Sequence, residues 1–139
     1  LVPFRAEHML TFVNRDTDVM QEMKFAIEKE RGPAFTAIVD DKVIGCGGVV
    51  ILWSGVGAAW VAVSKDIEPY KVWMTRTVRH ALRDIVRSLK LHRVEAVVLA
   101  DSDSRWIYTV GFHLENAVAK RYTQDKRDVV RFEFLQEDI

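Results

Sequence analysis

Acidic side chains near residue 100 are the first candidates for chemistry. Asp101 and Asp103 follow a run rich in valine and leucine, Glu95 lies inside that run, and Glu115 lies in the segment beyond it. A carboxylate in such a place orients or deprotonates an amine, and burial would raise its pKa. The competing roles are structural: helix capping for the aspartates, which we favour, and pairing with an arginine for the glutamates.

Basic side chains recur every three or four residues between positions 76 and 90, so they lie along one side of a predicted helix. A solvated face is the favoured explanation. Alternatively, residues 71 and 76 near the start of the helix bind phosphate groups as positive charges. A nucleic-acid surface ranks last, because no aromatic ladder interleaves the stripe. The stripe consists of Arg76, Arg79, Arg83, Arg87 and Lys90.

Aromatic and sulfur-containing side chains supply weaker candidates. Trp60 and Trp106 are candidate walls of a ligand groove, although core packing is the ordinary explanation. Cys46 lies in a glycine-rich stretch and is expected to be a small buried hydrophobe rather than a nucleophile. The four histidines are scattered, and with the single cysteine they form no metal-binding spacing, so we predict no metal.

The bulk composition predicts one globular domain over residues 1–139. Hydrophobic residues make up 49% of the chain and charged residues 29%, which excludes a disordered or fibrous protein. Twenty basic and twenty acidic residues cancel, so composition predicts no general attraction to nucleic acid or membranes. From the first residues we expect no signal peptide, and the sequence contains no apolar run of the ~20 residues a membrane helix needs. We therefore expect a cytoplasmic protein.

Hydrophobic periodicity predicts alternating helices and strands. A short strand at 1–5 and helices at 6–13 and 16–31 precede a strand hairpin of 34–39 and 43–52, then a strand at 58–63. Glycines at 45, 47 and 48 predict a bulge or a close backbone approach in the second hairpin strand. A long helix between Pro69 and His92 leads to a central strand at 93–100. A short helix at 104–110, ended by Gly111, precedes a final hairpin of 112–122 and 129–135.

This order of elements resembles the GNAT (GCN5-related N-acetyltransferase) fold over nearly the whole chain. Residues 103–112 read Asp-Ser-Arg-Trp-Ile-Tyr-Thr-Val-Gly-Phe. They are similar to the family's segment of a small polar residue, an arginine, two apolar or aromatic residues and a closing Gly-Phe. The resemblance implies an α/β (α+β) domain whose mixed, mostly antiparallel sheet of six to seven strands is flanked by helices. It also implies a V-shaped opening between the fourth and fifth strands, 58–63 and 93–100.

The same resemblance implies an N-acyltransferase in which an amine attacks the thioester of acetyl-CoA directly. Backbone N–H groups in the opening would polarise the thioester carbonyl, and a positioned acid would protonate the departing thiolate. Tyr108 would be that acid, and Asp101 or Glu95 would handle the amine proton. The acceptor amine, on a small molecule or a protein, stays open. The residues implied at the cofactor are Val61, Ala62, Val63, Lys71, Arg76 and Arg105.

Two positions depart from the family pattern. Residues 64–75 contain no glycine, where the family usually carries Gln/Arg-x-x-Gly-x-Gly/Ala around the CoA pyrophosphate. The family's tyrosine, four residues before the closing glycine, is Ile107 here, and Tyr108 lies about 100° further around the helix. Tyr108 replaces it only if the helix register shifts.

The glycine-poor loop and the tryptophan in the last short helix also resemble small GNAT-like proteins of tailed bacteriophages and prophages. Some of those are described as internal virion or assembly proteins. This resemblance implies an alternative: a non-catalytic protein of the infected cell or the virion that acts through contacts with a phage structural protein or with a second copy of itself.

Overall fold

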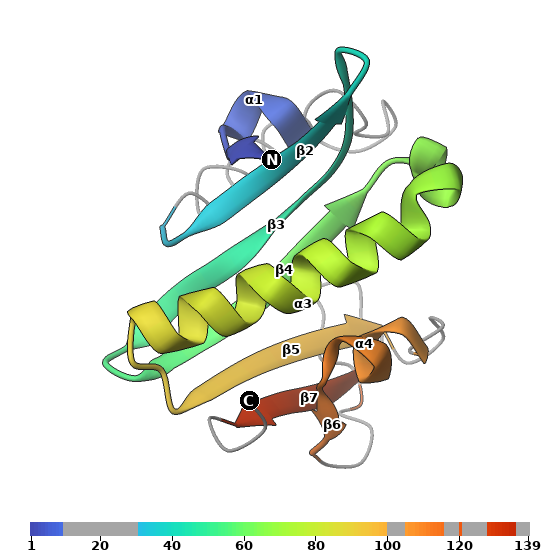
Figure 1. The fold of residues 1–139 in the computed structure, drawn as a ribbon. Coiled ribbons are helices and arrows are strands. Elements are labelled where there is room, and N and C mark those ends of the chain that lie inside the picture. Colours follow the sequence, from blue (N-terminus) through green and yellow to red (C-terminus); the bar gives the residue numbers. More distant parts are fainter. Residues whose placement is uncertain (10–30, 100–104, 116–119, 121–127, 136–139) are drawn as a thin grey trace. The chain divides into compact units, whose positions relative to one another are not determined.

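The structure, a computed structural model, describes residues 1–9, 31–99, 105–115, 120 and 128–135 (Figure 1). Seven strands follow the order β1-β2-β3-β4-β5-β7-β6, and most neighbours are antiparallel. The chain divides into two compact units: residues 1–51 with 59–71, and residues 52–58 with 72–139. The expectation of one domain over residues 1–139 stays a prediction.

The first unit is built on antiparallel strands. β1 (Val2–Pro3) pairs with β2 (Ala34–Val39), and β2 pairs with β3 (Lys42–Trp53). A single helical turn, α1 (Ala6–Met9), follows β1. Asp40 and Asp41 join β2 to β3, and both have positive φ angles, as a type I′ hairpin turn requires. The predicted hairpin is confirmed to within one residue at each end.

Glycines in β3 allow other parts of the backbone to come close. A Cβ on Gly48 would lie 2.5 Å from the carbonyl oxygen of Pro33, and one on Gly47 would lie 3.1 Å from that of Trp60. The register of β2 against β3 also shifts beside Gly45. The bulge and the close approach that these glycines predict are both confirmed.

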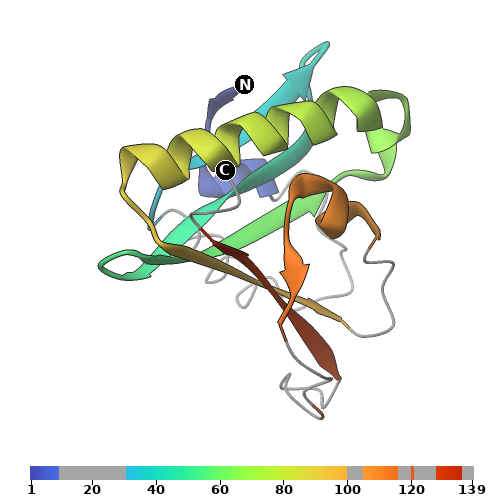
Figure 2. The same cartoon turned by 60° about the horizontal axis from the view of Figure 1, so that its bottom comes forward.

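The second unit contains the three-stranded arrangement β5-β7-β6, which both ribbon views show (Figures 1 and 2). β5 (Arg93–Leu99) pairs with β7 (Val129–Leu135) along its whole length, and β6 (His113–Leu114) pairs with β7. β4 (Val56–Val63) pairs in parallel with β5 over three residues only, Val56–Ala58 against Arg93–Glu95. The parallel ladder is therefore much shorter than its antiparallel neighbour.

Two helices belong mainly or entirely to the second unit. α3 (Lys71–Ser88) buries one stripe of side chains, Met74, Leu82, Ile85 and Val86. α4 (Arg105–Val110) ends at Gly111, whose φ of 112° is left-handed. A Cβ there would also lie 3.0 Å from the Phe134 ring, so glycine is required for two reasons. The predicted left-handed ending of this helix is confirmed.

The last strand shows the predicted alternation of faces. Phe132 and Phe134 are each 1% exposed, while Arg131 and Glu133 between and beside them are half-buried. Successive side chains of a strand point to opposite faces, so one face of β7 is core and the other is polar. This polar face carries the charged cluster described below.

Some predicted elements lie outside the described residues. These are residues 16–30 of the helix predicted at 16–31, whose last residue, Arg31, forms a bend, and most of the strand at 112–122, of which β6 is the described strand part. Of the helices that the structure describes, none is both long enough and apolar enough to span a bilayer.

Candidate functional site

The segment between β4 and α3, expected to be a loop, is a 3₁₀ helix, η1 (Lys65–Tyr70), that continues into α3 at Lys71. Ser64 begins it. The Asp66 N–H donates to the Ser64 hydroxyl at 3.1 Å, and the Ile67 N–H donates to the Ser64 carbonyl at 3.1 Å. The first N–H groups of a helix are the ones that bind phosphate. Here two of them are already bonded to the protein.

The predicted phosphate-binding cations are accessible to solvent. Lys71 Nζ lies 2.8 Å from Glu68 Oε2, and the two side chains are 60% and 75% exposed. Such an exposed pair contributes little stability, so an anion competes readily with Glu68 for the lysine. Arg76 is exposed on α3 in the second unit. Both side chains are therefore available as charges.

The side chains of the predicted cofactor strand alternate in exposure. Val61 and Val63 are 44% and 48% exposed, whereas Ala62 packs against the buried Cys46. Trp60 also packs there, with its ring 5.0 Å from that of Phe4 in an edge-to-face arrangement. Trp60 is thus half-buried and packs against the core of the first unit, in agreement with the ordinary explanation for it.

Cys46 lies in a polar network that the sequence did not predict. Burial raises the pKa of its thiol, and a hydrogen bond with Thr36 lowers it to a smaller extent. Thr36 Oγ1 lies 3.7 Å from Cys46 Sγ and 2.7 Å from His8 Nδ1. Because the raised pKa keeps the thiol protonated, Cys46 is the small buried side chain that was predicted, not a nucleophile.

In α4 the helix register places Ile107 in the core and Tyr108 outside it. Ile107 is 8% exposed and Tyr108 is 49% exposed, with the Tyr108 ring 5.3 Å from Phe132 in an edge-to-face contact. The Phe112 N–H donates to the Ile107 carbonyl, which closes the helix in this register. The Tyr108 side chain therefore points away from the side of the helix that carries Ile107.

Three further candidate residues lie in or just before α4. Trp106 Nε1 donates to Thr75 Oγ1 at 2.9 Å, so its indole connects α4 to α3 rather than standing free as a groove wall. Arg105 is the first residue of α4. Asp101, a candidate base, lies outside the described residues.

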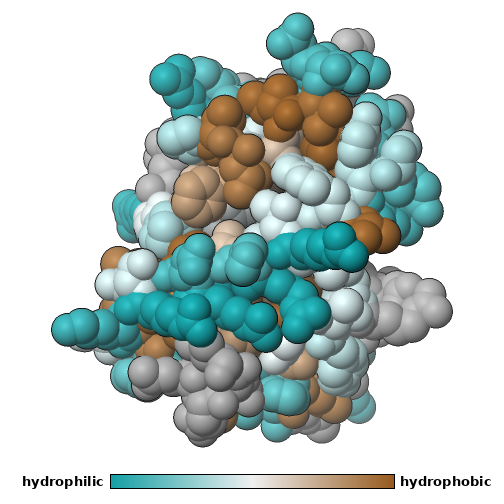
Figure 3. All heavy atoms as spheres, viewed as in Figure 1, coloured by the Kyte–Doolittle hydropathy of each residue, from teal (hydrophilic) through white to brown (hydrophobic). Residues whose placement is uncertain are grey.

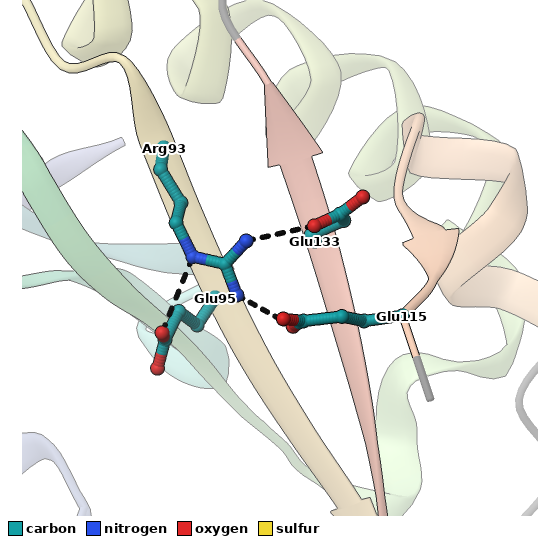
Figure 4. Close-up of polar contacts among 4 residues, drawn as sticks. All are labelled: Arg93, Glu95, Glu115 and Glu133. Atoms are coloured by element: carbon teal, nitrogen blue, oxygen red, sulfur yellow. Dashed lines mark hydrogen bonds and ion pairs between the residues drawn. The ribbon is translucent and has the colours of Figure 1, made fainter. Parts of the chain in front are cut away.

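Glu95 belongs to a charged cluster centred on Arg93 (Figure 4). Arg93 Nε lies 3.3 Å from Glu95 Oε1, Nη1 lies 2.7 Å from Glu133 Oε2, and Nη2 lies 2.5 Å from Glu115 Oε2. The four side chains are only 22–27% exposed. Glu95 thus has the second of its two predicted roles, pairing with an arginine.

The Arg93 cluster, consisting of Arg93, Glu95, Glu115 and Glu133, connects three segments of the second unit. Burial by itself lowers the pKa of Arg93, but hydrogen bonds and charge from the glutamates outweigh it and raise the pKa. Three carboxylates around one guanidinium leave an excess of two negative charges. Sequence reasoning missed the centre of this cluster, although arginine and glutamate two residues apart share a strand face. No group of three or more acidic, histidine or cysteine side chains suited to a metal ion occurs among the described residues.

Comparison with known proteins gives a match in structure but not in sequence. No family model and no curated protein matches the chain. A GNAT-family acetyltransferase from Bacillus anthracis superposes with a TM-score of 0.72 at 15% identity, covering 98% of this chain and 93% of that one. An IAA acetyltransferase from Bacillus cereus superposes with a TM-score of 0.72 at 16% identity, and the match covers 96% of each chain.

A third solved structure is a variant of the spermidine N-acetyltransferase from Vibrio cholerae. Its TM-score is 0.72 at 14% identity, and the match covers 97% of this chain and 94% of that one. At these identities the likeness concerns the fold. The chain has the GNAT fold, with a seven-stranded, mostly antiparallel sheet flanked by helices.

Proposed function

We propose that this chain, which has the GNAT fold, is an acyl-CoA-dependent N-acyltransferase that transfers the acetyl group of acetyl-CoA to an amine. The observation that carries the proposal is the segment 105–112. It forms a short helix ended by a left-handed Gly111, with the Tyr108 side chain outside the core. The structural neighbours, a spermidine N-acetyltransferase among them, support the same reaction class by analogy of fold.

The proposed reaction is direct transfer without a covalent enzyme intermediate. The neutral amine attacks the thioester carbon, the new C–N bond forms, the C–S bond breaks, and the thiolate takes a proton. The exposed Tyr108 hydroxyl supplies that proton, from a different direction than a side chain at residue 107 would. Asp101 accepts the proton of the amine, because Glu95 is paired with Arg93. Main-chain N–H groups of Val61–Val63 stabilise the oxyanion.

The cofactor would be held mainly by side-chain charge. The N–H groups of Asp66 and Ile67 are bonded to Ser64, so the main chain offers few donors to a pyrophosphate. Lys71, Arg76 and Arg105 would bind the phosphates instead. This arrangement predicts an affinity for acetyl-CoA that falls steeply with salt.

A second candidate function rests on the same helix start. Ser64 accepts a hydrogen bond from an N–H group at the start of η1 that would otherwise be available to a pyrophosphate. If this capping prevents CoA from binding, the fold is used without its cofactor. The chain would then be a non-catalytic protein, such as a phage virion or assembly component, that acts through contacts with a protein partner or a second copy.

Turnover tests the proposal. The protein would be incubated with acetyl-CoA and a panel of spermidine, a peptide with a free N-terminal alanine and a lysine peptide, and acetylated products would be detected by mass spectrometry. We expect an acetylated amine and a kcat roughly 100-fold lower for Tyr108→Phe with KM unchanged. Tyr70→Phe removes a hydroxyl to which no role is assigned, and it should keep the wild-type rate.

Two results would count against the proposal. The absence of acetylated product from every member of the panel would favour the non-catalytic alternative. An unchanged kcat for Tyr108→Phe would remove Tyr108 from the reaction even if transfer occurs.

A further inference from the structure

The exposed face of α3 carries a row of positive charge that the proposed reaction does not use. Arg79, Arg83 and Arg87 follow one another at four-residue spacing, and Lys90 follows the end of the helix. Arg79, Arg87 and Lys90 are exposed, and Arg83 is half-buried. Over the helix this row is about 12 Å long, at 1.5 Å per residue. Figure 3 shows a continuous hydrophilic band where α3 lies. We call Arg79, Arg83, Arg87 and Lys90 the α3 basic row.

No ion pair neutralises the basic row within the part of the chain that the structure describes. The ion pairs of that part involve Arg5, Lys71 and Arg93, and none involves a member of the row. Asp84 is the one acidic residue of α3. The net charge of the whole chain is zero, so the excess of positive charge here is local and not a property of the composition.

The row also lacks the apolar centre that a protein partner usually needs. The exposed large apolar residues of this helical segment are at its two ends, Val72 and Trp73 before the row and Leu89 near its end. Between Arg79 and Arg87 the apolar side chains are buried or half-buried. Protein interfaces are depleted of charge at their core, whereas nucleic-acid interfaces are much more positively charged.

We propose that the α3 basic row binds the phosphate backbone of double-stranded nucleic acid without reading its sequence. A guanidinium matches a phosphate with two parallel hydrogen bonds. A duplex carries one negative charge per about 1.7 Å of its axis, so the row meets enough phosphates to occupy every member. The missing aromatic ladder is no obstacle, because stacking serves single strands and backbone contacts to a duplex do not need it.

The test is fluorescence anisotropy of a labelled 20-base-pair DNA duplex titrated with the protein. With about four phosphates neutralised, Kd should rise roughly 100-fold between 50 and 200 mM salt. Arg79→Glu/Arg87→Glu, at two exposed members of the row, should weaken binding at least about 100-fold at 50 mM salt, because two contacts are lost and two repulsions gained. The neutral Arg79→Gln/Arg87→Gln should weaken binding less and keeps the helix propensity.

A matched control separates the row from net charge. Arg31→Glu/Lys42→Glu makes the same change in charge at two exposed residues of the first unit. We expect this variant to bind within about threefold of wild type, with circular dichroism confirming that all variants are folded.

Three outcomes would overturn the inference. One is no binding at 50 mM salt up to about 100 µM protein. Another is equal loss in the row variant and the control variant. The third is binding to a poly-glutamate peptide of matched charge as tight as binding to the duplex, which would indicate an acidic protein partner instead.

Discussion

Arg93 and the arginines of α3 show two opposite uses of one side chain within the same unit. Arg93 is held by three carboxylates and is 22% exposed. On α3, Arg79 and Arg87 are exposed and Arg83 is half-buried, and none of the ion pairs among the described residues involves them. A fixed, neutralised guanidinium stabilises the fold, whereas a solvated one is left available for ligands.

The physical reason for the difference is desolvation. Removing the arginine from a partly buried cluster leaves its carboxylates without a cation, which costs a few kcal/mol of stability. An exposed arginine remains hydrated, and its pairing contributes about 0–1 kcal/mol at most. The comparison therefore predicts large stability effects at residue 93 and small ones on α3.

The largest expected effect is that of Arg93→Met. Its loss leaves Glu95, Glu115 and Glu133 facing one another without a cation, and we expect the free energy of unfolding to fall by about 2–3 kcal/mol. Urea denaturation followed by circular dichroism measures this. Arg79→Met, at an exposed arginine of α3, is the control, and it is expected to lie within about 0.5 kcal/mol of wild type. Equal losses of unfolding free energy in the two variants would contradict the proposed difference between Arg93 and the arginines of α3.

Arg93→Lys should have a smaller effect, about 1 kcal/mol at pH 7. An ammonium is compact and cannot reach three carboxylates in the way a planar fork does. The variant also adds a dependence on pH. The carboxylates raise the folded-state pKa of a lysine there, so its stabilisation is complete below about 10.4 and is lost as pH rises further.

Wild type should show no such alkaline loss from the cluster. The pKa of Arg93 is itself raised, so its contribution is lost only above the pKa of an ordinary arginine, outside the range in which proteins are studied. Unfolding midpoints of the two proteins between pH 8 and 11 make the comparison. If the midpoints of wild type and Arg93→Lys changed with pH in the same way, the charge at residue 93 would not be what stabilises the cluster.

Glu95→Gln should change stability by less than about 0.5 kcal/mol. Its contact with Arg93 is the longest of the three, at 3.3 Å, and the cluster has two negative charges in excess. Removing one charge relieves repulsion while an amide oxygen still accepts the hydrogen bond. A loss of 2 kcal/mol in a denaturation experiment would show that Glu95 is essential to the cluster.

Arg79→Gln/Arg83→Gln should be the mildest change, with a gain of up to about 0.5 kcal/mol at low salt. Like charges four residues apart on a helix repel, and glutamine has a similar helix propensity. The gain should vanish in 0.5 M salt, where the repulsion is screened. Thermal unfolding at the two salt concentrations decides it, and a loss of stability at either would indicate a structural role for the row.

The sequence predicted the strongly periodic elements well. Helical spacing of apolar residues placed α3, and strict alternation placed β7 with Phe132 and Phe134 in the core. The turn at Asp40 and Asp41 and the left-handed Gly111 followed from local backbone preferences. Such signals are short-range, so one sequence is sufficient to find them.

The rest depended on contacts between distant residues. Glu115 and Glu133 are 22 and 40 residues from Arg93 in the sequence. No local sequence pattern predicts that their carboxylates meet the Arg93 guanidinium. η1 was expected as a loop because its hydrogen bonds depend on Ser64 acting as a cap. The exposure of Tyr108 follows from a helix register that the core position of Ile107 fixes.

Isothermal titration with acetyl-CoA tests the proposed function most directly. We expect binding that weakens with salt and is reduced at least about tenfold by Lys71→Ala/Arg76→Ala, but not by Arg31→Ala/Lys42→Ala, the matched loss of two exposed charges. No heat and no thermal stabilisation at millimolar acetyl-CoA would contradict the proposed acyltransferase and favour a fold used without its cofactor.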